Sequence, residues 1–166
     1  MLRHSPPSPK PKRRLGAAAV ELALVLPLFV TLTFVSLELG HALNMVQKLE
    51  SAARNGGRLA AKDVPPALLA GGLTANQKVI NDIKNMLRAD GFPPNNIAIT
   101  IVHADGASVG QTFDLADAGN QYQMMKITLT IPYADVKMFP LPMFIQQSTM
   151  LTSKLIVSRG RSTLNY

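Results

Sequence analysis

Apolar residues are concentrated in one long run near the N-terminus, and shorter periodic segments follow it. The long run, residues 17–39, reads AAAVELALVLPLFVTLTFVSLEL, and its only charged residues are Glu21 and Glu38. A helix needs about 20 consecutive apolar residues to cross the hydrocarbon core of a bilayer. The run therefore predicts a transmembrane helix over residues 17–39.

The helical pattern continues over residues 40–62. Apolar or small residues recur there at spacings of three and four, namely Val46, Leu49, Ala53, Gly56 and Ala60. This spacing predicts an amphipathic extension of the same helix, with one stripe packed against a globular domain. Pro65 and Pro66 should then close the helix, because the residue before a proline disfavours helical backbone angles.

Residues 63–166 have the pattern of a small α+β headpiece. Thr74 and Gln77 form a capping-box sequence, which predicts a second helix that stops at Gly91. Alternating apolar positions predict strands over 97–103 and 124–133, and a less regular strand over 150–158. We expect these to form a roughly three-stranded antiparallel sheet packed on the helices. The apolar segment 139–144 contains two prolines, so it is either buried under the sheet or exposed to a partner.

The formal charge of +7 is concentrated at the N-terminus. Five of the seventeen Lys and Arg residues lie in the first fourteen positions, which contain no acid, and the rest of the chain has an excess of only two positive charges. Because these remaining charges form no stripe interleaved with aromatic residues, we expect no nucleic-acid partner. The positive-inside rule instead predicts that the N-terminus is cytoplasmic and that the headpiece lies outside.

Residues suited to catalysis or metal binding are few and scattered. Cysteine is absent. The three histidines lie far apart and without ligand spacing, and three aspartates border a loop that lacks the EF-hand pattern; these residues are His4, His41, His103, Asp105, Asp114 and Asp117. No phosphate-binding loop or nucleophile elbow occurs. We expect no enzymatic activity, no metal and no cofactor, and we expect the aspartates to lie in a solvated loop.

Glu21 needs compensation inside the apolar run, because a carboxylate at the centre of a spanning helix costs about 2.5–3.5 kcal/mol. A cut between Gly16 and Ala17 would give Ala17 a free amine one helical turn from Glu21, on the same face. The cut would also remove basic residues that hold the start of the helix at the cytoplasmic surface. We therefore predict a cleavage site at Gly16 and Ala17 and an assembly role for Glu21, within one subunit or between neighbours.

The junction RRLGAAAVE resembles a type IV prepilin signal, in which basic residues and a glycine precede a mature chain with Glu at its fifth position. The resemblance implies that a membrane aspartyl prepilin peptidase cuts after Gly16. Over residues 13–61 the chain is also similar to the TadE-like family of the tight-adherence (Tad) pilus machinery. The shared elements, in order, are Gly16, Val20-Glu21-Leu22-Ala23-Leu24, Pro27, Glu38-Leu39-Gly40, and a small-residue stretch that contains Arg54, Gly56 and Arg58.

Two departures from the TadE-like pattern leave open a TadF or TadG relative. Leu22 stands where Phe is commoner, and the small-residue stretch has an extra glycine beside Gly56. The resemblance implies a pilin-like fold and a minor pilin or pseudopilin, whose partners are other pilin subunits and the pilus assembly machinery in adhesion. Pro27 should kink the helix, since it lacks an amide donor. Glu38 is expected to be a solvated helix end at the far membrane interface.

The predicted organisation follows from these observations. Residues 1–16 are a basic cytoplasmic leader that cleavage removes, residues 17–39 cross the bacterial inner membrane once, residues 40–62 extend the helix, and residues 63–166 form a periplasmic headpiece, which processing could transfer to a pilus. Three alternatives remain: a secretory signal peptide cut after Ala42, an uncleaved membrane anchor that carries a periplasmic scaffold or binding module, and a membrane-tethered enzyme.

Overall fold

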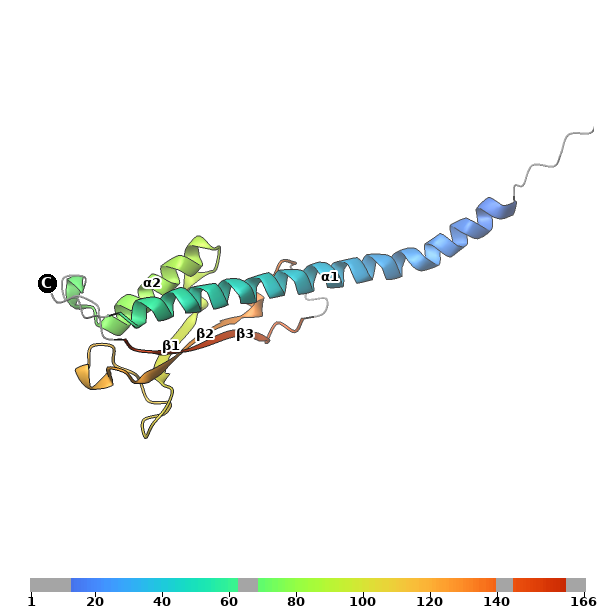
Figure 1. Cartoon of the computed structure of the whole chain (residues 1–166). Helices are drawn as coiled ribbons and strands as arrows, with labels where there is room; N and C mark the ends of the chain where they lie inside the picture. Colours follow the sequence, from blue (N-terminus) through green and yellow to red (C-terminus); the bar gives the residue numbers. More distant parts are fainter. Residues whose placement is uncertain (1–12, 63–68, 140–144, 161–166) are drawn as a thin grey trace, which may run out of the picture. The chain divides into compact units, whose positions relative to one another are not determined.

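The computed structural model describes residues 13–62, 69–139 and 145–160 (Figure 1). Its helices are α1 (Arg13–Ala60) and α2 (Ala75–Ala89), and its strands are β1 (Ala98–His103), β2 (Met124–Pro132) and β3 (Met150–Ser158). The chain divides into two units, one up to Leu37 and one from Glu38 onward. A long apolar N-terminal helix, one further helix and a three-stranded antiparallel sheet confirm the predicted α+β class.

Helix α1 starts earlier than the apolar run that predicted it. It begins at Arg13, before Gly16 and Ala17, because nothing between these residues stops a helix. It is continuous through Pro27 and ends at Ala60, two residues before the end of the extension predicted over residues 40–62. The predicted stop at Pro65 and Pro66 lies outside the described residues.

Helix α2 has the N-terminus that its sequence predicted. The Thr74 hydroxyl accepts a hydrogen bond from the Gln77 amide, and the Gln77 side chain accepts one from the Thr74 amide. This reciprocal capping box satisfies two amide groups that the first turn of a helix leaves unbonded. The chain leaves the helix through Gly91, whose φ of 90° lies in the left-handed region that glycine adopts without strain.

The sheet has the order β1-β2-β3, and both pairs are antiparallel. Its register places Ile127 opposite Ile101 on one side and opposite Leu155 on the other. Alternate residues of β2, from Met125 to Ile131, are buried, as their spacing predicted. Strand β3 alternates more regularly than its sequence indicated, because Ser153 takes one of the inward positions and weakens the apolar pattern.

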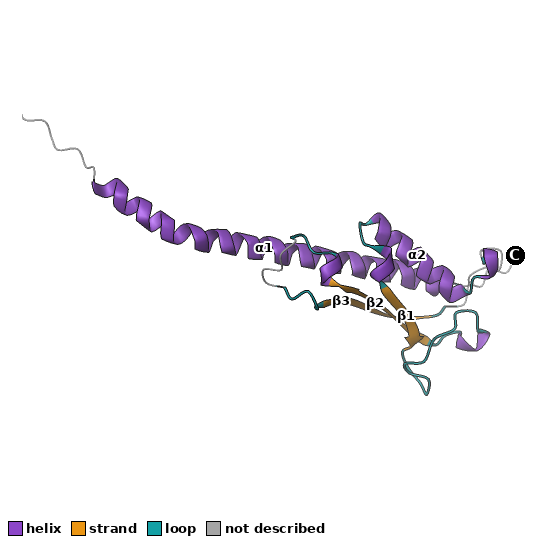
Figure 2. Cartoon of the chain, turned by 180° about the vertical axis from the view of Figure 1, so that it is seen from behind, coloured by secondary structure: helices purple, strands orange, loops and turns teal. Residues whose placement is uncertain are grey.

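The core of the second unit lies between the helices and one face of the sheet. The part of α1 after Glu38 and the whole of α2 lie over this face in both views (Figures 1 and 2). The core side chains come from all these elements and include Leu49, Ala53, Val79, Ile83, Leu87, Ile127 and Leu129. Each buried Leu or Ile side chain stabilises the fold by about 1.5–3 kcal/mol. The other face of the sheet is rich in threonine, and its Thr100, Thr128, Thr130 and Thr152 are exposed or half-buried.

The apolar segment 139–144, predicted to be buried under the sheet or exposed to a partner, lies outside the described residues from 140 to 144.

The three predicted loop aspartates, Asp105, Asp114 and Asp117, are exposed, as expected for a solvated loop. Two of them cap turns of their own loop, because Asp114 accepts a hydrogen bond from the Ala116 amide and Asp117 accepts one from Gly119.

Candidate assembly region on helix α1

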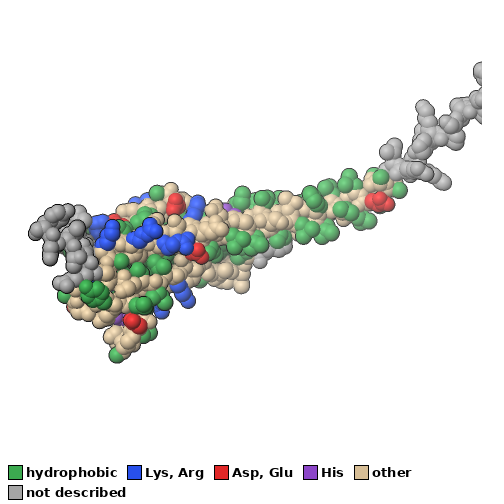
Figure 3. Space-filling model, viewed as in Figure 1, with side chains coloured by type: hydrophobic (Ala, Val, Ile, Leu, Met, Phe, Trp, Pro, Cys, Tyr) green, Lys and Arg blue, Asp and Glu red, His purple; other side chains and the backbone are tan. Residues whose placement is uncertain are grey.

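The first part of α1 exposes a continuous apolar surface. Residues 16–34 are all exposed, and they include Leu24 at 75% and Phe29 at 66%. Figure 3 shows hydrophobic side chains along this stretch. By length and composition it is the one helix among the described residues that could cross a membrane. An apolar surface of this extent is typical of a segment that contacts lipid or another protein.

Hydroxyl groups in this apolar segment bond to the backbone of their own helix. Thr31 Oγ1 donates to the Pro27 carbonyl at 2.8 Å, and Thr33 and Ser36 make the same bond to the residue four positions earlier. These bonds satisfy polar groups that would otherwise be costly in hydrocarbon. Among the polar side chains of this segment, only that of Glu21 has no such bond in the described structure.

Gly16, Ala17 and Glu21 lie together on the first turns of α1. All three are exposed, and Ala17 and Glu21 are one turn apart on the same face of the helix. The Gly16–Ala17 peptide bond lies inside the helix. The one-turn spacing of Ala17 and Glu21 is the spacing that a contact between a new Ala17 amine and the Glu21 carboxylate requires. Cleavage and assembly themselves remain predictions.

The predicted solvent exposure of Glu38 is wrong. Instead of a solvated helix end, Glu38 is 3% exposed, and its Oε1 accepts a hydrogen bond from Tyr133 Oη at 3.4 Å. Its other oxygen, Oε2, is buried and has no hydrogen-bond partner among the described residues. The cause is a contact between segments far apart in the sequence. Tyr133, the residue after β2, lies against Glu38, so the headpiece covers a side chain that the sequence pattern placed at the membrane interface.

His41 makes a second link between α1 and the turn after β2. It is three residues after Glu38, hence on the same side of the helix, and its Nε2 lies 2.6 Å from the Val136 carbonyl oxygen. Tyr133 is the first residue of the 3-10 turn Tyr133–Asp135, and Val136 follows this turn. Burial raises the pKa of Tyr133 above its ordinary value of 10.0, and the nearby Glu38 carboxylate raises this pKa further. The contacts of Glu38 with Tyr133 and of His41 with Val136 thus hold α1 against the turn that follows β2.

The glycines of the small-residue stretch are sites of close packing. A Cβ atom at Gly56 would overlap the end of the Ile83 side chain on α2, at 2.5 Å from its Cγ1. A Cβ atom at Gly57 would overlap Leu155 on β3. The extra glycine, which appeared as a departure from the family pattern, is therefore the position at which α1 approaches β3.

The two arginines of the same stretch face solvent. Arg54 pairs with Glu50 at 3.6 Å, one turn away, with both side chains about half exposed or more, so the pair adds little stability. Arg58 is exposed and has no ion-pair partner among the described residues. The small-residue stretch thus contains two glycines that pack closely and two arginines that lie on the surface.

Some contacts within the headpiece were not foreseeable from local patterns. Asn76 on α2 donates to the Phe113 carbonyl at 2.6 Å and accepts from the Leu115 amide at 2.9 Å, which ties the loop before β2 to the helix. Buried Arg159 donates to the Asp117 carbonyl. Within residues 13–62, 69–139 and 145–160, no group of three or more His, Asp or Glu side chains is arranged to hold a metal ion.

These features define a class of protein: an α+β headpiece that follows an N-terminal helix compatible with a membrane anchor. The family model described as TadE-like protein matches residues 16–58, which is the segment on which the resemblance was based. The match confirms the TadE-like resemblance over about a quarter of the 166 residues. Together with the anchor-compatible helix, it supports a membrane component associated with a Tad pilus. Among curated proteins and among solved structures, none significantly matches the chain.

Proposed function

We propose that this protein is a minor pilin or pseudopilin of a Tad-type pilus or secretion system, cut after Gly16 and assembled through α1. The observation that carries the proposal is the TadE-like match, which begins at Gly16 on an exposed apolar helix. Glu21 is the only charged residue between Ala17 and Leu37. In this proposal the protein is inserted in the bacterial inner membrane with its N-terminus cytoplasmic and its headpiece periplasmic.

Cleavage would change what the helix can bind. The new amine of Ala17 would lie one turn from Glu21, and in a medium of low dielectric constant two opposite charges at such a distance attract strongly. The mature helix would also lose the basic leader, and with it the attraction to the anionic cytoplasmic surface. Its exposed apolar residues could then pack against the same residues of other pilin subunits. A prepilin peptidase and the pilus assembly machinery are the partners that this function requires.

The test of processing is the N-terminal sequence and intact mass of the protein isolated from its native host. A chain that starts at Ala17 supports the proposal, and replacement Gly16→Leu should leave the leader attached. Gly40→Leu is the matched control, since Gly40 is also exposed on α1 with nothing within 4 Å of an added Cβ. A start at Met1, or one after Ala42, contradicts the proposal and indicates an uncleaved anchor or a secretory signal.

The role of Glu21 is tested separately with Glu21→Ala in the native host. We expect normal cleavage, normal membrane insertion and loss of the protein from sheared filaments. Glu50→Ala is the control, because Glu50 is an exposed acid on the same helix that lies beyond the apolar segment. Unchanged recovery of Glu21→Ala in filaments would contradict an assembly role for this carboxylate even where cleavage is correct.

A further inference from the structure

Strand β3 has a free edge. It pairs with β2 on one side, and no described strand pairs with it on the other. Thr149 and Arg159, at its two ends, both bond to the β2 side, through Tyr133 and Gln123. In an antiparallel strand the amide and carbonyl groups of successive residues point in opposite directions. Because the odd positions Thr149 and Arg159 bond toward β2, the amides and carbonyls of Thr152, Lys154 and Ile156 point toward the free edge.

Among the described residues, Lys154 is the only one of the devices that usually protect a sheet edge. Natural sheets cover their edges or interrupt them with prolines, bulges and several charges. Strand β3 runs from Met150 to Ser158 with Lys154 as its only charge and without a proline. Ile156 is 58% exposed. A long, regular edge with unpaired amides and carbonyls is suited to pairing with an added strand.

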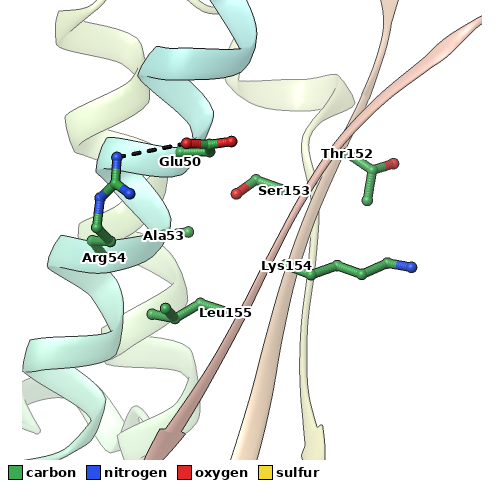
Figure 4. A pocket seen from close by; sticks show the side chains of 7 residues that line it. All are labelled: Glu50, Ala53, Arg54, Thr152, Ser153, Lys154 and Leu155. Atoms are coloured by element: carbon green, nitrogen blue, oxygen red, sulfur yellow. Dashed lines mark ion pairs between the residues drawn. The ribbon is translucent and has the colours of Figure 1, made fainter.

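A groove runs between this edge and α1, and we call it the β3 groove. It consists of two cavities of about 300 and 210 Å³ that share Arg54 and Leu155 as lining residues. On the strand side it is lined by residues 152–157, a length of about 20 Å for an extended chain. Figure 4 shows Ser153 and Leu155 pointing toward α1, whereas Lys154 points away from it.

Basic side chains surround the β3 groove. Arg54, Arg58 and Lys62 follow one another at intervals of four residues on and just after α1, and all three are exposed. Figure 3 shows Lys and Arg side chains gathered over this part of the molecule. Lys154 is exposed on the opposite side of β3. The one acid that lines the groove, Glu50, makes an exposed and therefore weak pair with Arg54.

We propose that β3 takes up an extended acidic segment of another protein as a fourth strand. The added backbone would bond to the outward amides and carbonyls of Thr152, Lys154 and Ile156. Its side chains would alternate between the groove, beside Arg54 and Arg58, and the open face of the sheet, beside Lys154. Acidic residues on either side would therefore meet a positive charge. The proposal does not depend on cleavage after Gly16.

The charge distribution argues against a second copy of this chain as the occupant. Symmetric pairing of two β3 edges would bring each Lys154 toward its equivalent in the other copy. It would also bring together the basic residues Arg54 and Arg58 of both copies. Like charges in adjacent strands destabilise a sheet. An acidic partner removes this repulsion.

The test measures binding of short capped peptides to the full chain in detergent micelles, by fluorescence anisotropy. The probe alternates Glu and Thr over about six residues, the length that the groove admits. One control alternates Lys and Thr, and the other is the Glu–Thr peptide with an N-methyl group on every backbone amide, which cannot donate the strand bonds from either edge. We expect the unmodified Glu–Thr peptide to bind, less tightly at high salt, and the two controls to bind more weakly or not at all.

Variants separate the backbone contribution from that of charge. Ile156→Pro removes one outward amide while keeping the bonds to β2, and Ile156→Thr is its control because it keeps the amide. We expect the first to weaken binding and the second to leave it unchanged, with circular dichroism to verify folding. Arg54→Ser and Arg58→Ser should each weaken binding of the Glu–Thr peptide up to about fivefold, the effect of losing one exposed ion pair.

Three results would overturn the proposal. The first is equal binding of the Lys–Thr and Glu–Thr peptides, and the second is equal binding of the methylated and unmethylated peptides. The third is absence of peptide binding combined with self-association of the chain that Ile156→Pro abolishes, which would identify a second copy as the occupant.

Discussion

Tyr133 Oη lies 3.4 Å from Glu38 Oε1, and both side chains are buried although 95 residues separate them in the sequence. Tyr133 continues the alternating inward positions of β2 and is the first residue of the turn after that strand, and Glu38 is the first residue of the second unit. The hydrogen bond is long, yet a buried carboxylate depends on every donor within reach. This contact fixes the start of the second unit on the sheet.

Removal of the Tyr133 hydroxyl should destabilise the headpiece. Tyr133→Phe leaves both oxygens of Glu38 buried without a donor among the described residues, and such a loss costs about 1–3 kcal/mol. Urea unfolding of the full chain in micelles, followed by circular dichroism, measures the effect. Tyr122→Phe is the control, since Tyr122 is 65% exposed. Equal stability of the two variants would show that the Tyr133–Glu38 bond contributes nothing.

The same pair predicts a double-mutant effect. Glu38→Leu removes the buried carboxylate, so the hydroxyl of Tyr133 loses its acceptor in that variant. Replacement of both residues, Glu38→Leu with Tyr133→Phe, leaves no unsatisfied group, and such a double change can be nearly neutral. We expect the double variant to lose less free energy of unfolding than the sum of the single variants. Additive losses would mean that the two side chains do not interact.

Stability should also fall at alkaline pH because of Tyr133. Burial and the Glu38 carboxylate raise the pKa of Tyr133 above 10.0, so the folded state favours the neutral phenol. The resulting stabilisation is fully present below the ordinary pKa of tyrosine and is lost as pH rises through the folded value. Tyr133→Phe should therefore lose less stability than the wild type between pH 9 and pH 11 (about one unit either side of that ordinary pKa). Parallel curves for the two proteins would contradict this account.

The elements of this protein were readable from local sequence, and the contact between Glu38 and Tyr133 was not. A period of two placed Tyr133 on the inward face of the strand predicted over 124–133, and a period near 3.6 placed Leu49 and Ala53 on the inward stripe of α1; all three side chains are buried. Both patterns depend on residues a few positions apart. The burial of Glu38 depends instead on which helix the end of β2 reaches, and no local period encodes that.

The candidate assembly region shows the same division. Its apolar run, its glutamate and its small residues could be recognised because family motifs are local and ordered. The reason for the glycine pair could not, since Gly56 meets α2 and Gly57 meets β3, and both partners lie far along the chain. Asn76 has no sequence signal either, because its two bonds go to loop backbone atoms, which carry no side-chain identity.

Asn76 should be important for the loop before β2. Asn76→Ala removes a donor to Phe113 and an acceptor for the Leu115 amide, and each hydrogen bond contributes about 0.5–1.5 kcal/mol. We expect lower stability in urea and faster amide exchange at Leu115. Asn81→Ala is the control, because Asn81 is exposed on the same helix. If amide exchange at Leu115 were unchanged, the hydrogen bond to Asn76 would not be what holds the loop.

The two adjacent glycines should differ in their response to alanine. Gly56→Ala drives a methyl group into Ile83, which is fully buried and cannot move aside. Overpacking lowers the free energy of unfolding by about 1–3 kcal/mol, which exceeds the gain in helix propensity of about 0.5–1 kcal/mol. Gly57→Ala meets the end of Leu155, which is half-buried beside the β3 groove and has room to rotate. We therefore expect Gly57→Ala to be close to neutral.

Gly40→Ala provides the reference for both substitutions, since an added Cβ there meets nothing within 4 Å. The free energy of unfolding in urea should decrease in the order Gly40→Ala, Gly57→Ala, Gly56→Ala. The same experiment separates close packing from helix flexibility as the reason for the glycine pair, because flexibility would make the adjacent positions Gly56 and Gly57 respond alike. An equal change at these two positions would contradict packing against Ile83 as the constraint on Gly56.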